Sequence, residues 1–364
     1  MIIFNALQTS LSGGIGRYSF ELSKELYKQK IDMKIVIRKE DYKDFSFAKD
    51  EDLIIAEGIT NSIQRNLYEQ IKLPRMIYRK YPDAKIHYPD SMAPIFAKNY
   101  SIITVHDIAF RSLKKVFKLK TVLWKNFITK ISLKKADKVI AITEFTKDEI
   151  NKYYNLKDKS KIDVVYNGFN DFSKDNIEEK NIRDEIKNIK GEYIFTINTI
   201  SPRKNVDGII KAFNEIKDKT NFKLVIGGAN GWLYNEVHEL VDTLKIRDRV
   251  IFTGKVNDDE LKFLYKNTSL FIYASFYEGF GLSPLEAMSY KKPCLVSNVT
   301  SMPEVVGKSA ILIDPYNIKN MAEKMIETID NRTIREEMSK LGSKRIEFFS
   351  WEKCAKDTVK TYTR

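Results

Sequence analysis

Two glutamates, Glu278 and Glu286, lie eight positions apart on either side of a short glycine-containing loop. The apolar run before the loop predicts a β-strand, and the segment after it predicts a helix. A carboxylate at each end of such a loop can accept hydrogen bonds from sugar hydroxyls, while backbone N–H groups at the helix start can face a phosphate. The loop between the glutamates consists of Gly279, Phe280, Gly281 and Leu282.

Glu286 also has a purely structural interpretation. Ser283 and Glu286 fit the N-cap and N3 positions of a capping box, in which the two side chains bond the free N–H groups of the helix start. Ser301 and Glu304 have the same spacing, and we expect a structural role for them. No such local role explains Glu278 or the loop glycines, so this block is the strongest functional signal in the chain.

Two adjacent cations, Arg203 and Lys204, follow the first predicted strand of the second half. Arginine binds phosphate groups bidentately and lysine acts as a point charge, so the pair suits a diphosphate. The alternative is an ordinary solvated turn. Gly14 follows the first strand of the chain and precedes a helix, a place where glycine lets the backbone approach a phosphate and the helix start favours an anion. Its alternative is a tight turn.

His106 stands at the end of the predicted strand Ser101–Val105. Most single histidines are structural, but ligands of parallel α/β sheets bind beyond the carboxyl ends of the strands. We therefore expect a functional role for His106 and structural roles for His87 and His238. No metal site is predicted, because the acidic run at 50–52 lies in a charged loop without a phosphate-binding context.

Strands and helices alternate along the whole chain, which is typical of a parallel α/β protein. In the first half we expect strands at Ile2–Ala6, Met33–Ile37, Leu53–Ala56, Lys85–His87, Ser101–Val105, Lys138–Ile142 and Asp163–Val165. In the second half we expect them at Tyr193–Ile197, Lys223–Ile226, Val250–Thr253, Leu270–Ala274, Cys294–Ser297 and Ala310–Ile313. The charged segment 171–190 predicts a linker between domains at 1–170 and 191–348, and a last helix lies within 349–364.

A predicted helix at Leu113–Lys135 combines positive charge with a recurring apolar face. The segment from Arg111 to Lys135 contains nine basic residues and no acidic one. Apolar residues at helical spacing include Val116, Leu123, Phe127 and Ile128, and lysines such as Lys114, Lys115 and Lys118 occupy the other side. The simplest interpretation is a helix that packs on the core, but an anionic membrane surface also suits this composition.

The composition is that of an ordinary globular protein, with 43% hydrophobic and 30% charged residues and a net charge of +13. Met1 to Leu7 predicts a strand and not a signal peptide, and no apolar run approaches the roughly 18–20 residues that cross a bilayer. Two distant cysteines, Cys294 and Cys354, favour a reducing cytoplasmic location. The usual nucleic-acid-binding modules are missing, so we expect no nucleic-acid partner.

Taken together, these motifs resemble the retaining glycosyltransferases of family 4, and the resemblance covers essentially the whole chain. It runs from the glycine loop at 13–17 through 106–107, 142–146, 166–168, 202–205 and 227–232 to the two-glutamate block, and it ends with Phe349-Ser350-Trp351. It implies the GT-B fold, in which two Rossmann-like domains face each other across a cleft and the C-terminal helix crosses back to the N-terminal domain. The details are most similar to mannosyltransferases of bacterial surface polysaccharide synthesis.

The resemblance implies a role for each motif. Glu286 would bind the donor ribose, and Glu278 with the backbone of 279–282 would hold the donor sugar. Arg203 and Lys204 would neutralise the diphosphate, and His106 would contact the transferred sugar. Gly14 would approach the diphosphate from the first domain. One departure is Asn198-Thr199, where many relatives carry Gly-Arg, so one phosphate-binding cation is missing.

We therefore expect a metal-independent, retaining hexosyltransferase that needs no cofactor besides its nucleotide-sugar donor. GDP-mannose is the favoured donor and a UDP-hexose the alternative. A glycan or lipid-linked oligosaccharide at the inner face of the cell membrane is the expected acceptor, with the segment Leu113–Lys135 on the membrane. Two other classes remain open, a nucleotide-sugar epimerase and a non-enzymatic basic protein that binds membranes or nucleic acid.

Overall fold

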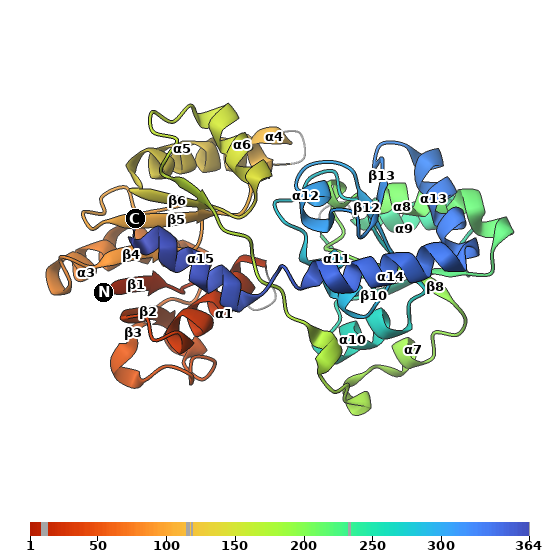
Figure 1. Cartoon of the computed structure of the whole chain (residues 1–364), viewed down its shortest axis with the longest axis horizontal. Helices are drawn as coiled ribbons and strands as arrows, with labels where there is room; N and C mark the ends of the chain where they lie inside the picture. The colour runs from red at the N-terminus through yellow and green to blue at the C-terminus, as the bar shows by residue number, and fades with distance from the viewer. Residues whose placement is uncertain (9–13, 114–116, 118, 232–233, 364) are drawn as a thin grey trace. The chain divides into compact units, whose positions relative to one another are not determined.

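The computed structural model describes residues 1–8, 14–113, 117, 119–231 and 234–363. The chain forms two compact units, each built around its own parallel sheet (Figure 1). Unit 1 comprises Met1–Gly168 together with Phe349–Arg364, and unit 2 comprises Phe169–Phe348. The C-terminal segment therefore belongs to the same unit as the N-terminus.

Unit 1 contains a seven-stranded sheet in the order β3-β2-β1-β4-β5-β6-β7, and all neighbouring strands are parallel. Phe4 is paired with Ile35 on one side and with His87 on the other, so the strand order reverses at β1. This reversal is the switch point of a doubly wound sheet, beyond which ligands commonly bind. The strands are β1 (Ile2–Asn5), β2 (Met33–Arg38), β3 (Leu53–Ala56), β4 (Lys85–Tyr88), β5 (Ser101–Val105), β6 (Lys138–Ala141) and β7 (Ile162–Val164).

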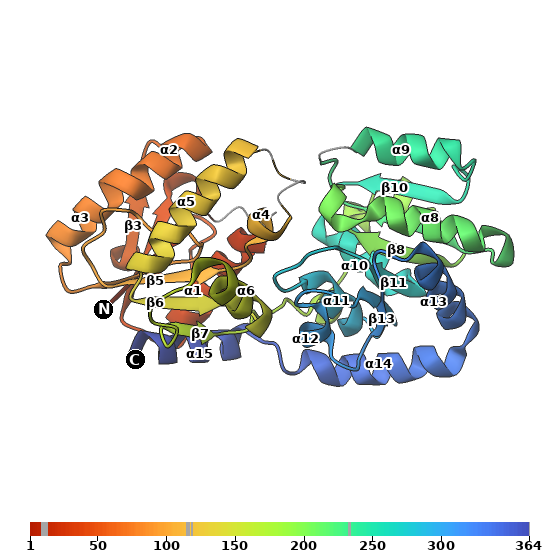
Figure 2. The ribbon, with the colours of Figure 1, turned by 90° about the horizontal axis from the view of Figure 1, so that it is seen from above.

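Helices cover both faces of this sheet (Figure 2). One face packs against α1 (Gly14–Lys28) and α15 (Trp351–Thr363), whose side chains share an apolar cluster. The other face packs against the helices that follow β3, β5 and β6. These are the π-helical η3 (Tyr68–Lys72), α3 (Leu73–Lys80), α5 (Leu119–Lys135) and α6 (Glu144–Tyr154). α2 (Ser62–Leu67) precedes η3 and buries none of its side chains; shorter turns are η1 (Lys39–Asp41), η2 (Asp50–Asp52) and α4 (Ala109–Ser112).

The predicted crossing of the C-terminal helix onto the N-terminal unit is confirmed, because α15 packs against α1. Gly168 is the residue that permits the approach. A Cβ at this position would overlap the backbone nitrogen of Trp351 and would lie 2.6 Å from two of its indole carbons. Close by, the rings of Tyr166 and Phe349 meet edge to face with centroids 6.0 Å apart. Two of the sequence motifs therefore meet each other at the start of α15.

Unit 2 contains a six-stranded parallel sheet in the order β10-β9-β8-β11-β12-β13. β8 lies between β9 and β11, with Ile194 paired with both Leu224 and Leu270, so this sheet also reverses its order at its first strand. The strands are β8 (Tyr193–Ile197), β9 (Lys223–Gly227), β10 (Val250–Gly254), β11 (Leu270–Tyr273), β12 (Cys294–Ser297) and β13 (Ile311–Ile313). Each predicted strand is present, with ends that differ by one residue at most.

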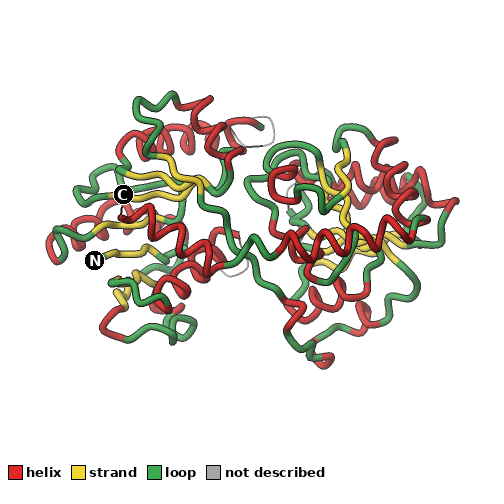
Figure 3. Tube along the Cα trace, in the orientation of Figure 1, coloured by secondary structure: helices red, strands yellow, loops and turns green. Residues whose placement is uncertain are grey.

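The helices of unit 2 also form two layers (Figures 2 and 3). One apolar cluster joins the sheet to α8 (Val206–Ile216), α9 (Tyr234–Thr243) and α13 (Ile318–Asp330). On the other face Tyr265, from α10 (Asp258–Asn267), packs against Phe195 and Phe271 of the sheet. The remaining helices are α11 (Leu282–Ser289), α12 (Met302–Val306) and α14 (Arg332–Ile346), with the short turns η7 (Pro202–Lys204) and η8 (Lys217–Lys219).

The segment 171–190, which the sequence predicts as a linker, belongs to unit 2 and packs on α10. Arg183 forms an ion pair with the buried Glu260 at 2.6 Å, and its guanidinium also donates to the carbonyl oxygens of Thr253 and Lys255. Asn181 bonds Asp259 at 2.7 Å. The segment contains three short turns, η5 (Phe172–Lys174), η6 (Glu179–Asn181) and α7 (Asp184–Lys187).

The helix predicted at Leu113–Lys135 starts later than expected. It begins at Leu119, and Lys114, Lys115, Val116 and Lys118 lie outside the described residues. Ile128 of the predicted apolar face is buried, but Leu123 and Phe127 are 61% and 56% exposed, so that face does not pack on the core as a whole. The buried side of the helix also includes Ser132, which bonds the backbone of Ala93. Among the helices that the structure describes, none is long and apolar enough to cross a membrane.

A prediction concerns the contact that holds α15 to unit 1. Replacing Gly168 by alanine should force Trp351 and the start of α15 away from the unit, because backbone atoms cannot yield as a flexible side chain does. Overpacking of this kind typically costs about 1–3 kcal/mol. The thermal unfolding midpoint should fall by several degrees, whereas Lys353→Ala on the exposed side of the same helix should leave it unchanged. An unchanged midpoint in Gly168→Ala would contradict the assigned contact.

Candidate functional site

The cation pair and the first glutamate lie together at the carboxyl edge of the unit 2 sheet. Arg203 and Lys204 are in η7, which follows β8, and Glu278 is in the loop that follows β11. β8 and β11 are paired neighbours and run parallel, so both loops leave the same edge. The backbone joins them directly, because the N–H of Phe276 donates to the carbonyl oxygen of Arg203 at 2.9 Å.

Asn205 holds the cation loop in place. It has a left-handed backbone conformation, with φ of 54°, which asparagine tolerates better than most residues. Its buried amide donates to the carbonyl oxygens of Ala274, at 3.1 Å, and Pro315, at 2.8 Å. Gly208 leaves room for this amide, since a Cβ there would overlap the Asn205 side chain. The loop therefore depends on contacts with two later segments of the unit.

Glu278 is the centre of the charged contacts. Its side chain is nearly buried, and Lys204 Nζ lies 2.5 Å from Oε1. Arg203 Nη1 lies 3.4 Å from Oε2 and also donates to the carbonyl oxygen of Tyr277 at 2.9 Å. The Tyr273 hydroxyl donates to Oε1 at 3.0 Å. One carboxylate thus holds both of the predicted phosphate-binding cations.

These contacts determine the ionisation of Glu278. Burial raises the pKa of the carboxyl, but the charges of Lys204 and Arg203 together with the hydrogen bonds outweigh burial, and the net pKa lies below its usual value. Glu278 is therefore a carboxylate at neutral pH. The neighbouring Tyr273 behaves in the opposite way, because burial and the negative charge of Glu278 raise its pKa and keep the phenol neutral.

Contacts with the segment 300–302 hold the loop after Glu278 in place. Ser301 Oγ donates to the carbonyl oxygen of Glu278 at 2.9 Å, and the N–H of Glu278 donates to Thr300 Oγ1 at 3.2 Å. The predicted capping box at Ser301 is therefore wrong, since its hydroxyl bonds the Glu278 loop and makes no cap for α12. Gly281 has a φ of 83°, a conformation that favours glycine, and a Cβ there would lie 2.6 Å from Met302 Sδ.

The second capping-box interpretation is also wrong. α11 begins at Leu282, with Gly281 as its N-cap, so Ser283 lies inside the helix and makes no cap. The carboxylate of Glu286 instead accepts a hydrogen bond from the hydroxyl of Tyr265 at 2.9 Å. Both residues are buried, and the bond orients one oxygen of Glu286. The capping role of Glu286 is thereby replaced by a hydrogen bond to Tyr265, and its contact with a donor ribose stays a prediction.

His106 follows β5 in unit 1 and is partly buried. Its Nε2 lies 2.9 Å from the carbonyl oxygen of Pro89, which can only accept, so Nε2 carries the proton and Nδ1 is an acceptor in the neutral ring. Burial lowers the pKa of His106 more than the Pro89 carbonyl and nearby Asp90 raise it. The Tyr18 ring packs edge-on against the imidazole at 4.7 Å between centroids. His106 is thus a fixed, neutral hydrogen-bond acceptor.

Of the other residues singled out in unit 1, the structure describes Gly14 and His87 but not Gly13. Gly14 is the first residue of α1, and no described atom lies within 4 Å of the place that a Cβ would take. Gly13 lies outside the described residues. His87 is structural as predicted, because its two ring nitrogens bond Tyr362 and Thr104 at 2.7 Å each in a buried environment. In unit 2, His238 stacks on Phe252 with ring centroids 4.0 Å apart.

Sequence reasoning missed three residues that shape the glutamate site: Tyr273, Thr300 and Tyr265. Tyr273 had a recognisable signal, because it is a tyrosine at the carboxyl end of an otherwise aliphatic or aromatic buried strand. Thr300 and Tyr265 had none, since each reaches the site only through the tertiary fold.

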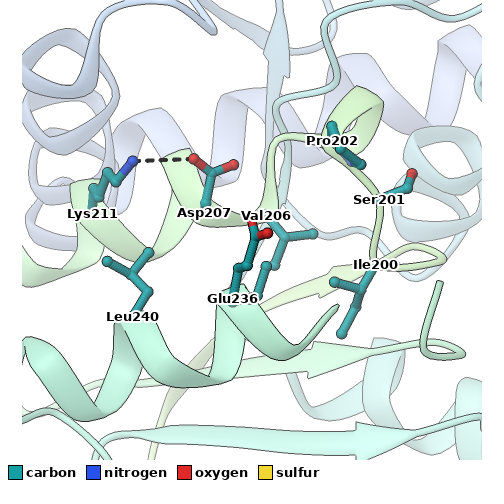
Figure 4. A pocket seen from close by; sticks show the side chains of 9 residues that line it. Ile200, Ser201, Pro202, Val206, Asp207, Lys211, Glu236 and Leu240 are labelled. Carbon is teal, nitrogen blue, oxygen red and sulfur yellow. Dashed lines mark hydrogen bonds and ion pairs between the residues drawn. The ribbon is translucent and has the colours of Figure 1, made fainter. Parts of the chain in front are cut away.

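Two further features bear on the chemistry. Within the described ranges, no group of three or more histidine, cysteine or acidic residues is placed to hold a metal ion. A separate pocket of about 290 Å³ lies between the starts of α8 and α9 (Figure 4). Its walls include an ion pair at 3.1 Å between Lys211 and Asp207, and the side chain of Glu236. It includes none of Arg203, Lys204 or Glu278.

Comparison with known proteins gives the class directly. Residues 12–171 match the family described as Glycosyltransferase Family 4, and residues 177–345 match the family described as Glycosyl transferases group 1. The Escherichia coli O-antigen chain mannosyltransferase B is 27% identical over 364 residues, which cover 96% of this chain and 95% of that protein. The Salmonella typhimurium O-antigen chain mannosyltransferase RfbU is 32% identical over 235 residues, which cover 64% and 62%.

Solved structures agree on the fold. Anabaena HepE in complex with UDP-glucose has a TM-score of 0.77, with 16% identity and coverage of 100% of this chain and 99% of that one. The two doubly wound parallel sheets have the GT-B fold. The chain belongs to the group 1 glycosyltransferases of family 4, and its enzymatic class is that of the retaining hexosyltransferases.

A prediction tests the role of Glu278 in the unliganded protein. Glu278→Gln removes a buried carboxylate that is the counter-charge of two partly buried cations, and breaking a buried ion pair typically costs about 3 kcal/mol. Because the folded-state pKa of Glu278 is depressed, its stabilisation should be complete above the unfolded pKa of about 4.3. It should disappear as the pH falls through the folded-state value.

The measurement is the unfolding midpoint of both proteins between pH 7 and pH 3.5. The difference between wild type and Glu278→Gln should stay constant near neutral pH and narrow in acid. Glu215→Gln, an exposed glutamate of the same unit, should show no difference at any pH. A gap that widens in acid would contradict the assigned ionisation.

Proposed function

We propose that unit 2 holds the nucleotide-sugar donor, with Lys204 and Arg203 on the diphosphate. The observation that carries the proposal is the buried ion-pair network in which Glu278 orders both cations at the carboxyl edge of the sheet. Glu286, with one oxygen held by Tyr265, is suited to accept hydrogen bonds from the two ribose hydroxyls. Glu278 and the backbone of 279–282 would hold the donor sugar, and Gly14 would admit the diphosphate close to the backbone of unit 1.

The proposed reaction breaks the bond between the anomeric carbon and the diphosphate. Negative charge grows on the departing diphosphate, so preorganised positive groups lower the barrier, and removing one such donor typically costs about 10²–10³ in rate. Lys204 and Arg203 supply this charge, and a metal ion is therefore not required by the proposal. His106 would accept a hydrogen bond through Nδ1 from a hydroxyl of the transferred sugar, which needs the neutral ring described above.

We further propose that the donor is GDP-mannose and that the acceptor is a glycan or lipid-linked oligosaccharide of cell-surface polysaccharide synthesis. Two curated relatives support this, because both are named O-antigen chain mannosyltransferases. A UDP-hexose is the alternative donor, and the HepE structure with UDP-glucose supports that alternative. An epimerase would need acid and base carboxylates beside the sugar, and Glu278 is unsuited to proton transfer because it is ionised and paired with two cations.

The proposal is tested by thermal stabilisation with GDP, UDP, GDP-mannose and UDP-hexoses. A ligand at 100 times its dissociation constant should add about 2.7 kcal/mol to the stability. Glu286→Gln keeps an acceptor for Tyr265 but loses the carboxylate, so nucleotide affinity should fall about 10- to 100-fold. Selective stabilisation by GDP compounds supports the mannosyl donor, and UDP selectivity overturns it. No response to any nucleotide would overturn donor binding itself.

We also propose that the enzyme works at the inner face of the cell membrane and that the α5 region contacts anionic lipid. The exposed side of α5 presents four apolar side chains: Leu119, Leu123, Trp124 and Phe127. Its exposed charges are all positive, because the helix contains no acidic residue. The neighbouring stretch 62–80 has the same character, with Ile63, Leu67 and Ile71 exposed four residues apart and its one acidic residue, Glu69, buried.

Vesicle binding tests this membrane contact. Replacing Lys120, Lys125 and Lys130 with glutamate removes three positive charges near the lipid, each of which contributes about 1 kcal/mol, so binding to anionic vesicles should fall more than 100-fold. The same charge change at Lys219, Lys266 and Lys319 on unit 2 is the control and should have little effect. Equal losses in both triple variants would show a net-charge effect and would overturn the assigned surface.

A further inference from the structure

Tyr273 occupies a central place in the donor-side network although no motif includes it. It is the last residue of β11, is 3% exposed, and stacks on Phe271 within the same strand. A Cβ on Gly281 would lie 3.7 Å from its ring, so the tyrosine also supports the loop after Glu278. A rigid strand therefore presents one phenol to both loops of the site.

The phenol hydroxyl bridges the cation and the carboxylate. Lys204 Nζ lies 3.0 Å from Tyr273 Oη, and Oη lies 3.0 Å from Glu278 Oε1. Lysine can only donate and an ionised carboxylate can only accept, so the donors of both hydrogen bonds are determined. Lys204 donates to Tyr273, and Tyr273 donates to Glu278. The ammonium also lies 5.2 Å from the centroid of the tyrosine ring.

This arrangement restricts the orientation of the ammonium group. An ammonium has three N–H bonds in tetrahedral directions, and two of them point at Glu278 Oε1 and Tyr273 Oη. The two contacts fix both the position of Nζ and the rotation of the ammonium group about the Cε–Nζ bond, and together they give the third N–H one direction. With Glu278 alone, the flexible lysine side chain could swing about the contact between Nζ and Oε1 and change the direction of the third N–H.

Packing by itself does not explain the hydroxyl. A phenylalanine would fill the same volume against Phe271 and Gly281, so the aromatic ring accounts for the hydrophobic contacts and the oxygen accounts for the bridge. The phenol stays neutral because burial raises its pKa, and it therefore keeps the proton that it donates to Glu278.

We propose that Tyr273 is a positioning residue that aims Lys204 at the second phosphate of the donor diphosphate. The inference rests on the proposed function, because it assumes that Lys204 binds a diphosphate. We expect Tyr273 to raise the affinity for the diphosphate group. We expect it to have no effect on affinity for the base or the ribose, or on the stability of the fold.

The test compares nucleoside diphosphate and monophosphate binding in Tyr273→Phe. Using the nucleoside that binds wild type, diphosphate affinity should fall about tenfold and monophosphate affinity should change less than twofold. Tyr193→Phe is the matched control, since Tyr193 is a buried tyrosine of β8 whose hydroxyl donates to the carbonyl oxygen of Leu264 at the other end of the sheet. It should bind both ligands like wild type.

A second variant keeps the inference testable if Tyr273→Phe is less stable than the control. In a Lys204→Met background, adding Tyr273→Phe should cause no further loss of diphosphate affinity, because the tyrosine acts through the lysine. Additive losses, or equal losses for monophosphate and diphosphate, would overturn the inference. Failure of wild type to bind any nucleotide would instead overturn the proposed function, and that outcome is visible before any variant is made.

Discussion

The site of unit 2 depends on one constraint, namely that two partly buried cations are held against one buried carboxylate. A buried charge is costly without a partner, so Lys204 and Arg203 require the carboxylate of Glu278. The rest of the local structure keeps these groups in reach of one another. Parallel pairing of β8 and β11 brings their loops to one edge, and Asn205 and Ser301 bond the two loops to the remainder of the unit.

This arrangement also suits a reaction in which negative charge develops. Groups that are already oriented need not reorganise when the diphosphate departs, and such preorganisation is a major source of rate enhancement in enzymes. The carboxylate that orders the cations also neutralises part of their charge. In the proposed donor complex the diphosphate would compete with Glu278 for the two cations, and the balance between them would set the affinity for the donor. The Tyr273 hydroxyl bonds both Lys204 and Glu278, so it contacts the cation and the carboxylate at once.

In unit 1 the equivalent constraint is the packing of the C-terminal helix α15 against the N-terminal part of the chain. Trp351 packs over Gly168 and lies beside Tyr18, with ring centroids 6.1 Å apart, and Tyr18 in turn packs against His106. The C-terminal helix thus supports the surroundings of the histidine although it is about 250 residues away in sequence. The motifs at 166–168 and 349–351 meet for a steric reason, since only glycine at position 168 leaves room for the backbone and indole of Trp351.

Much of the fold was predictable because parallel strands are short, continuously apolar and separated by helices, and these patterns are local. The places of the cation pair, Glu278 and His106 beyond the carboxyl ends of strands were predictable for the same reason, whereas their chemical roles stay predictions. Predictions failed where tertiary contacts compete with local ones. Ser283 and Ser301 have capping-box spacing, but the conformation of Gly281 and the carbonyl oxygen of Glu278 decided their roles. Helical periodicity alone could not predict which side of α5 is buried, because Leu123 and Phe127 are exposed whereas Ser132 bonds Ala93.

The most direct test is a crystal structure of the protein with the nucleoside diphosphate that stabilises it. The account predicts that the second phosphate lies within hydrogen-bond distance of Lys204 Nζ and of the Arg203 guanidinium. It also predicts that Glu286 contacts the ribose hydroxyls and that the bond between Tyr273 and Glu278 is retained. A diphosphate bound away from Lys204 and Arg203, for example in the pocket between α8 and α9, would contradict the central claim.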